Sequence, residues 1–140
     1  MRILLDTNIV LDFLLMREPH AAAAVKIFES LSTRAISGYV TANTLTDIFY
    51  ILSKRLGHVT ARAQLRHLFN LVGVISVTEK DCLYAFDLPM SDFEDALVIT
   101  CALKQSLDYI VTNDSEFLDT TVADVSRLSG ADFNRFILNE

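Results

Sequence analysis

The sequence has few residues of the kinds that bind soft metals or form disulfides. It contains two cysteines and three histidines. Cys82 and Cys101 fall within apolar helical patterns with no metal-ligand spacing around them, so we expect two buried free thiols. The histidines are scattered and show neither H-x-x-x-H spacing nor a nearby nucleophile motif. This scarcity argues against a zinc centre.

A run of apolar residues long enough to cross a bilayer is also absent from the sequence. The N-terminal stretch MRILLDTN meets a carboxylate too early to hold the apolar region of a signal peptide. We therefore expect a cytoplasmic protein with no membrane partner.

Basic residues are scarce as well. Lysine and arginine number 12 against 18 aspartates and glutamates, which gives a net charge of −6 and a pI near 4.9. Such a balance argues against binding of nucleic acid by bulk electrostatics. A nucleic-acid partner would need local basic groups or bound cations.

What the sequence does contain is enough apolar material for one globular core. Of its 140 residues, 51% are hydrophobic and 21% are charged, which is typical of a folded domain rather than a disordered chain. No repeats, linkers or low-complexity segments interrupt it. We expect a single domain over residues 1–140.

Predicted strands and helices alternate along the chain. Apolar runs predict strands over residues 2–5, 35–40, 73–77 and 109–112, with a weak one near 122–125. Helical spacing predicts helices over residues 8–16, 19–31 (with Pro19 at the first helical position), 45–56, 60–71, 79–86, 92–105 and 132–138. Strands separated by helices indicate parallel pairing in a layered α/β domain.

Two aspartates directly follow predicted strands. Ligands of parallel α/β sheets bind outside the carboxyl ends of the strands, so Asp6 and Asp114 are the first candidates for a site. We expect Asp6 to have no structural duty that a neutral residue would not perform, whereas Asp114 has the alternatives of an Asx-turn or a helix N-cap. We expect Asp12 to be a solvated helix residue.

The stretch SDFEDAL places three carboxylates before a long apolar run. Ser91 and Glu94 match a capping box, which accounts for Glu94, and Asp92 would favour the helix dipole. Asp95 has no such explanation. It lies within about 60° of Asp92 on a helix, and like charges so placed destabilise the helix unless a cation lies between them.

Asp47 is ambiguous from the sequence. It can complete a capping box with Thr44, or it can join Asp6, Asp95 and Asp114 at the ends of the strands. Four such carboxylates would form an all-oxygen pocket, the ligand set that Mg²⁺ and Mn²⁺ prefer.

Four pieces of sequence, in this order and approximate spacing, resemble the PIN-domain ribonucleases: LLDTNIVLD, TANTLTDIFYIL, SDFEDALVITCAL and DYIVTNDSEF. The resemblance spans nearly the whole chain. That family includes the toxins of VapBC-type toxin–antitoxin pairs. The resemblance implies a three-layer α/β/α sandwich with a central parallel sheet, and an acidic pocket that binds Mg²⁺ or Mn²⁺.

The resemblance also implies roles for particular residues. Asp6, Asp47, Asp95 and Asp114 match the catalytic acids, although Asp47 stands where many members carry glutamate. Asp92 matches an additional acid, so the implied metal ligands are Asp6, Asp92, Asp95 and Asp114. The implied residues for orienting Asp6 or binding substrate are Thr7, Asn8, Thr112, Asn113 and Arg17.

The implied chemistry is metal-dependent hydrolysis of RNA, in which a bound cation activates a water and stabilises charge on the phosphoryl oxygens. The implied partners are RNA, an antitoxin protein and a second copy of the chain. Exposed apolar residues between positions 19 and 71 can serve such interfaces or the core, and Arg17 can touch phosphate or remain a solvated charge.

Two other functions fit the same residues. One is a non-catalytic PIN-like interaction module with a weak or empty metal pocket, which the aspartate at position 47 and the low pI favour. The other is a phosphohydrolase with an aspartyl intermediate at Asp6. That chemistry usually relies on a second aspartate two positions on, where this chain has Asn8.

Overall fold

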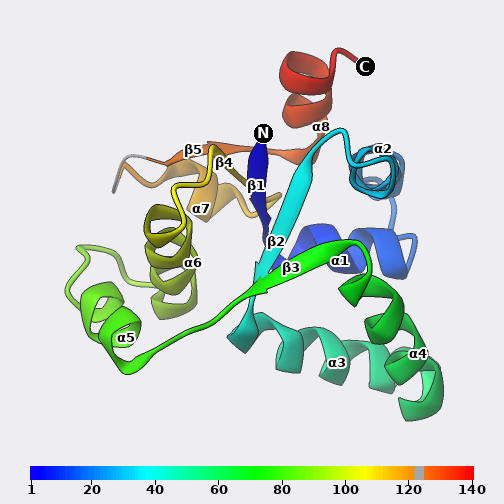
Figure 1. Cartoon of the computed structure of the whole chain (residues 1–140), viewed down its shortest axis with the longest axis horizontal. Coiled ribbons are helices and arrows are strands. Elements are labelled where there is room, and N and C mark those ends of the chain that lie inside the picture. Colours follow the sequence, from blue (N-terminus) through cyan, green and yellow to red (C-terminus); the bar gives the residue numbers. More distant parts are fainter. Residues whose placement is uncertain (122–124) are drawn as a thin grey trace.

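The centre of the molecule is a parallel β-sheet (Figure 1). The computed structural model describes residues 1–121 and 125–140. Within these residues the sheet has five strands in the order β3-β2-β1-β4-β5, and each neighbouring pair is parallel. The strands are β1 (Arg2–Leu5), β2 (Ser37–Thr41), β3 (Val72–Ile75), β4 (Tyr109–Val111) and β5 (Ser126–Leu128).

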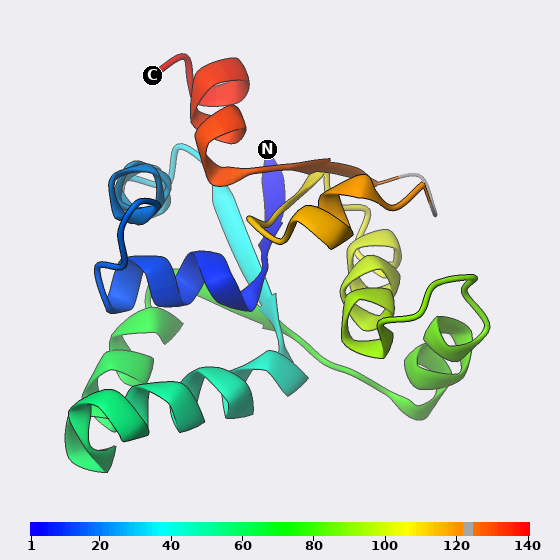
Figure 2. The ribbon, with the colours of Figure 1, turned by 180° about the vertical axis from the view of Figure 1, so that it is seen from behind.

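Helices cover both faces of the sheet and make three layers (Figures 1 and 2). One side holds α1 (Thr7–Leu14), α2 (Ala21–Ser32), α3 (Ala42–Leu56), α4 (His58–Phe69) and α8 (Gly130–Phe133), which continues into the π-helical η1 (Asn134–Leu138). The other side holds α5 (Glu79–Phe86), α6 (Phe93–Lys104) and α7 (Ser115–Asp119). The predicted three-layer α/β/α architecture is confirmed.

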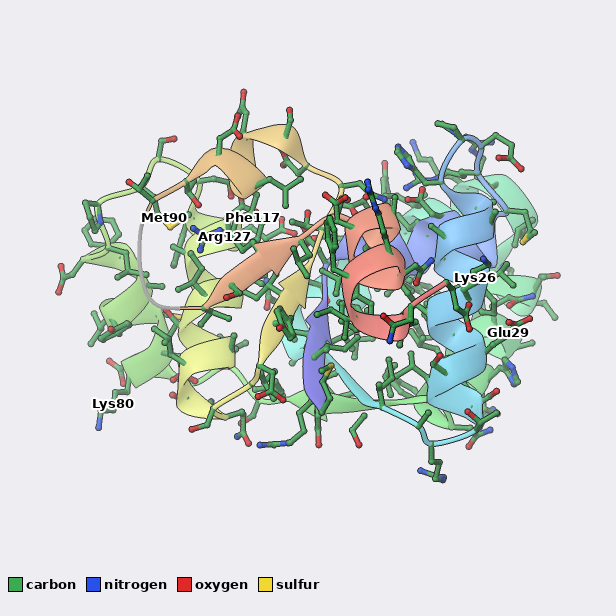
Figure 3. All side chains as sticks on the ribbon, turned by 90° about the horizontal axis from the view of Figure 1, so that it is seen from above. Lys26, Glu29, Lys80, Met90, Phe117 and Arg127 are labelled. Atoms are coloured by element: carbon green, nitrogen blue, oxygen red, sulfur yellow. The ribbon has the colours of Figure 1, made fainter. Side chains whose placement is uncertain are left out.

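The side chains of the central strand β1 alternate between two hydrophobic cores, one on each face of the sheet. Ile3 and Leu5 pack with residues of α1 to α4, whereas Leu4 packs with α6 and α7, because successive side chains of a strand point to opposite faces. Phe117 belongs to the core on the face of Leu4 and lies beside Arg127 in the view from above (Figure 3), where the guanidinium carbon of Arg127 is 5.8 Å from the centroid of the Phe117 ring.

The topology brings the ends of three neighbouring strands to one edge. From β1 the chain crosses by α1 and α2 to β2 on one side, while β4 pairs with β1 on the other side. The strand order therefore reverses between β1 and β4, which is where ligands of open α/β sheets bind. Asp6 follows β1 at this point, and its backbone N–H extends the ladder to Val111 O at 3.0 Å.

Most of the predicted strands and helices are present in the structure, but several begin or end at other residues than predicted. The strand at 2–5 and the helix at 79–86 have the predicted bounds. The second helix begins at Ala21 rather than at Pro19, and α7 was not predicted. The closing helix begins earlier, at Gly130, because the Ser129 side chain caps it. Of the weak strand near 122–125, residues 122–124 lie outside the described residues, and β5 begins at Ser126.

The prediction of free thiols is confirmed for both cysteines, of which Cys101 is buried and Cys82 is half-buried. No helix in the described part of the chain combines the length and apolar character needed to span a bilayer.

Candidate active site

Asp6 lies at the end of β1, with 5% of its surface exposed. Its carboxylate caps α1 by accepting a hydrogen bond from the N–H of Thr7 at 2.9 Å. The other oxygen accepts from the Thr112 hydroxyl at 2.8 Å and from the Asn8 amide at 3.2 Å. The expectation that a neutral residue would serve equally well here was therefore wrong, because an amide could not accept all three of these hydrogen bonds. Burial raises its pKa most, and the charge of Asp114 adds to this, against the lowering effect of the three hydrogen bonds.

Thr112 connects Asp6 to the second predicted acid of this edge. Thr112 is fully buried, and its hydroxyl accepts the backbone N–H of Asp114 at 3.1 Å while donating to Asp6. The Asp114 carboxylate accepts the N–H of Glu116 at 3.0 Å and so caps α7. Of the two structural alternatives for Asp114, the N-cap is confirmed. One threonine thus sets the relative positions of the two acids.

Asp92 and Asp95 lie together at the start of α6. Asp92 is the N-cap, and its side chain accepts the backbone N–H of Asp95 at 3.0 Å. The predicted capping box of Ser91 and Glu94 was therefore wrong, because the helix begins one residue later than that box requires. Asp95 is buried in the first turn, with 8% of its surface exposed.

The surroundings of Asp95 are strongly acidic. Its pKa is raised to about 7, first by burial and then by the charges of Asp92, Asp6, Asp114 and Glu94. These four groups come from three separate segments of the chain. The structure thus brings Asp6, Asp92 and Asp114 within electrostatic reach of Asp95, whereas the predicted acid Asp47 is not among the groups that shift its pKa. A carboxyl with such a pKa is poised to exchange a proton for a cation near neutral pH.

Asp47 is exposed on α3, and of the acids at this edge its charge acts on Glu94. The helix begins at Ala42 after Thr41, and the Thr44 hydroxyl donates to Thr41 O at 2.8 Å. The capping box of Thr44 with Asp47 was therefore wrong, since neither residue is at the helix start. The charge of Asp47 raises the pKa of Glu94, after the larger effect of partial burial.

Sequence reasoning missed Glu94 as a member of the cluster. Its pKa is raised by Asp6 and Asp92 as well as by Asp47. The capping-box pattern led away from a site role for Glu94, because in such a box the glutamate carboxylate accepts a hydrogen bond from the backbone N–H of the N-cap residue. Its position next to Asp95, one residue inside the helix, is the signal that could have found it.

A second correction concerns Asp12, which we expected to be solvated. Only 3% of its surface is exposed. One carboxylate oxygen accepts from Arg17 Nε at 2.9 Å, and the other accepts from the Asn113 amide at 3.2 Å. An open cleft of about 490 Å³ lies beside this pair. It is lined by Asn8, Asp12, Arg17, Glu18, Pro19, His20, Asn113 and Asp114.

With this geometry in place, comparison with known families identifies the fold. The family model described as the PIN domain matches residues 2–116. The chain belongs to the PIN-domain family. No curated protein matches its sequence.

Solved structures share the fold of this PIN domain at low sequence identity. A VapBC2 complex from Rickettsia felis, bound to a promoter DNA fragment, contains a chain that matches with a TM-score of 0.71 and 18% identity, covering 92% of this chain and 98% of that one. VapC20 of Mycobacterium tuberculosis, a toxin that cleaves the sarcin–ricin loop, matches with a TM-score of 0.68 and 20% identity over 89% and 98%. DNA-bound VapBC from Salmonella typhimurium matches with a TM-score of 0.68 and 15% identity over 93% and 98%.

The acidic edge of the PIN domain suits a hydrated divalent cation. Among the described residues, no three histidine, cysteine or acidic side chains form a closed ligand set. Mg²⁺ nonetheless keeps several waters and needs only one or two carboxylates. The hydroxyls of Thr7 and Thr41, at the ends of β1 and β2, are buried without a hydrogen-bond partner. The donor chemistry and the mutual repulsion of the acids both fit such an ion.

Proposed function

We propose that this PIN domain is an endoribonuclease that hydrolyses RNA phosphodiester bonds with Mg²⁺ or Mn²⁺. The observation that carries the proposal is the raised pKa of Asp95, whose buried carboxyl lies among four other acids at the switch point of the sheet. No lysine or arginine is among the groups that shift it. Such repulsion destabilises the folded state and is relieved by a divalent cation.

Asp6, Asp92, Asp95 and Asp114 would hold the cation, and Asp47 would complete the catalytic set. A divalent cation there would lower the pKa of a bound water and stabilise charge on the phosphoryl oxygens. Asp6 is oriented for this task by hydrogen bonds to both of its oxygens. The net charge of −6 disfavours binding of RNA. The cation would offset the negative charge of the acidic pocket and so allow a phosphate to approach.

The residues predicted to orient Asp6 or to bind substrate make different contacts, and these contacts suggest different roles. Asn8 and Thr112 donate to Asp6, so in the proposed enzyme they hold an acid ligand in place. Asn113 bonds Asp12 and the first turn of α8. The Thr7 hydroxyl has no hydrogen-bond partner among residues 1–121 and 125–140, and we assign it to the substrate or to a bound water.

We further propose that the chain is the toxin of a toxin–antitoxin pair and forms a homodimer. The fold is shared with a sarcin–ricin-loop-cleaving toxin and with chains of VapBC complexes. Apolar side chains are exposed on α3 and α4 at Tyr50, Val59 and Phe69. Coexpression with the product of an adjacent gene, followed by size-exclusion chromatography with light scattering, tests both associations. A monomer that binds no such product would contradict them.

RNA cleavage by single variants tests the proposed activity. We expect Asp95→Asn and Asp6→Asn to abolish Mn²⁺-dependent cleavage of a labelled RNA, because each removes a charged ligand. Asp6→Asn should also unfold more easily, since an amide cannot accept all the hydrogen bonds that the carboxylate accepts. Asp87→Asn, an exposed position at the end of α5, is the matched control. Full activity in either site variant would overturn the proposal.

The non-catalytic interaction module remains the second candidate. The lack of a closed ligand set among the described residues favours it, as does an apolar surface on α5 and α6, where Leu83, Tyr84, Phe86 and Phe93 are exposed. A wild type that folds, binds no Mn²⁺ and cleaves no RNA would establish this candidate instead.

A further inference from the structure

The ion pair of Asp12 and Arg17 lies at a junction of three segments. Asp12 belongs to α1, Arg17 to the loop after it, and Asn113 to the loop between β4 and α7. Both oxygens of the buried carboxylate are used, one by Arg17 and one by Asn113. Only Asp12 is fully buried, since Arg17 is half-buried, and such a pair is a weak source of stability, because the desolvation of the buried charge offsets the attraction. A role in holding geometry explains its presence better than stability does.

The hydrogen bonds continue from this pair to the acid of the proposed site. Asn113 Nδ2 donates to Asp12, and the backbone N–H of Asn113 donates to Asn8 Oδ1 at 3.0 Å. Asn8 Nδ2 then donates to Asp6 Oδ2 and to the Thr112 hydroxyl, both at 3.2 Å. The chain of contacts therefore runs from Arg17 through Asp12, Asn113 and Asn8 to Asp6.

The orientation of each amide in this chain is fixed by a partner that can only donate. The N–H of Gly130 donates to Asn113 Oδ1 at 3.1 Å, so Asn113 must turn its NH₂ toward Asp12. The backbone N–H of Asn113 likewise donates to Asn8 Oδ1, so Asn8 must turn its NH₂ toward Asp6. The carboxylate of Asp12 accepts from the NH₂ of Asn113 and so holds the Asn113 side chain in this orientation. Through Asn113 it also holds the orientation of the Asn8 amide.

Arg17 reaches the same turn by a second route. Its Nη2 donates to the backbone carbonyl of Asn8 at 3.3 Å while Nε holds Asp12. The guanidinium thus fixes the first turn of α1, which begins directly after Asp6. The charge of Arg17 is compensated by Asp12, and Glu18 and Asp114 add negative charge to the cleft beside it. These surroundings disfavour a phosphate contact as its main role.

We infer that Asp12 and Arg17 are positioning residues, which act through Asn113 and Asn8 to hold Asp6 in the geometry that the acidic site needs. This inference rests on the proposed function, in which Asp6 binds the cation. Residues that orient a metal ligand are typically worth about 10–100-fold in metal affinity or activity.

The test compares Asp12→Asn, Arg17→Gln and the double variant with Glu18→Gln, an exposed residue of the same cleft. Mn²⁺ affinity is measured by calorimetry, and RNA cleavage is measured as kcat and KM well below the unfolding temperature. We expect each single variant to lose about 10–100-fold in Mn²⁺ affinity or kcat with KM unchanged. The double variant should lose no more than the worse single variant, and Glu18→Gln should match the wild type.

Two results would overturn the inference. A rise in KM with a shallower salt dependence, confined to Arg17→Gln, would show that Arg17 binds RNA phosphate instead. Unchanged kcat and Mn²⁺ affinity in variants that only unfold at lower temperature would show a purely structural role.

A third readout separates this inference from the proposed function. The side-chain amide resonances of Asn8 and Asn113 report their orientation without metal or RNA. We expect both to move in Asp12→Asn and to stay in Glu18→Gln. If they move but the wild type cleaves no RNA, the proposed function fails while the positioning of Asp6 stands. If the Asn8 resonance does not move in Asp12→Asn, the inference fails whatever the activity.

Discussion

At the scale of single residues, the acids of the site differ in what they do for the fold. Asp6, Asp92 and Asp114 each cap a helix, so their carboxylates have a structural use as well as a proposed catalytic one. For Asp95, no hydrogen bond from the described residues lowers the pKa, and the charges that raise it are those of other acids. The sequence was enough to predict which acidic residues gather at this edge. It did not predict the helix caps, because a cap depends on the residue at which the helix begins. The N-caps are Asp92 and Thr41, in place of the predicted Ser91 and Thr44.

The pH dependence of stability should report Asp95 directly. Its pKa is 3.8 in the unfolded chain and about 7 in the folded one, so the folded state binds the proton more tightly. Without divalent cations, the free energy of unfolding should therefore fall as the pH rises from about 4 to about 7, by about 2–4 kcal/mol. Urea unfolding across this pH range measures it.

Asp95→Asn is the matched variant, since an amide does not titrate. The fall in stability should be smaller in this variant, and at pH 7 it should be more stable than the wild type. An equal fall in both proteins would show that Asp95 is an ordinary surface acid.

At the scale of elements, one ion pair ties α5 to α6. Lys104 Nζ lies 2.6 Å from Asp81 and 2.8 Å from the carbonyl of Ser76. Asp81 also accepts the N–H of Thr78 and completes the capping box of α5. The hydrogen bond that Lys104 donates to Asp81, followed by that from the N–H of Thr78, holds the pKa of Asp81 below its usual value. The sequence predicted the bounds of α5, because its apolar spacing and its start signal agree; the contact with Lys104, 23 residues away, has no local signal.

Asp81→Ala should lower the free energy of unfolding by about 2 kcal/mol, because it removes a helix cap and a partner of a half-buried ion pair. Urea unfolding at pH 7 measures the loss, and Glu79→Ala, an exposed residue two positions away, is the control. The difference between the two should shrink as the pH falls below 3.8, the pKa of an aspartate in the unfolded chain, and through the lower pKa of Asp81 in the folded state. Equal stability of the two variants at pH 7 would contradict this account of the contact.

At the scale of the whole molecule, the alternation of strands and helices was enough to predict a parallel sheet with acids at its carboxyl edge. Asp6 and Asp114 were placed correctly, since parallel strands end at one edge and these residues follow β1 and β4. The burial of Asp12 could not be predicted, because its partners Arg17 and Asn113 come from other segments of the chain. A pattern along one helix does not reveal which loops fold over it.

The measurement that tests the central claim most directly is thermal unfolding of the wild type and Asp95→Asn, first in EDTA and then in millimolar Mn²⁺. The claim is that the carboxylates around Asp95 bind a divalent cation, and an ion that binds only the folded state must stabilise it. We predict that Mn²⁺ at about 100 times its Kd raises the Tm of the wild type by roughly 5 °C or more and leaves that of Asp95→Asn unchanged. No shift in either protein at saturating metal would contradict the account.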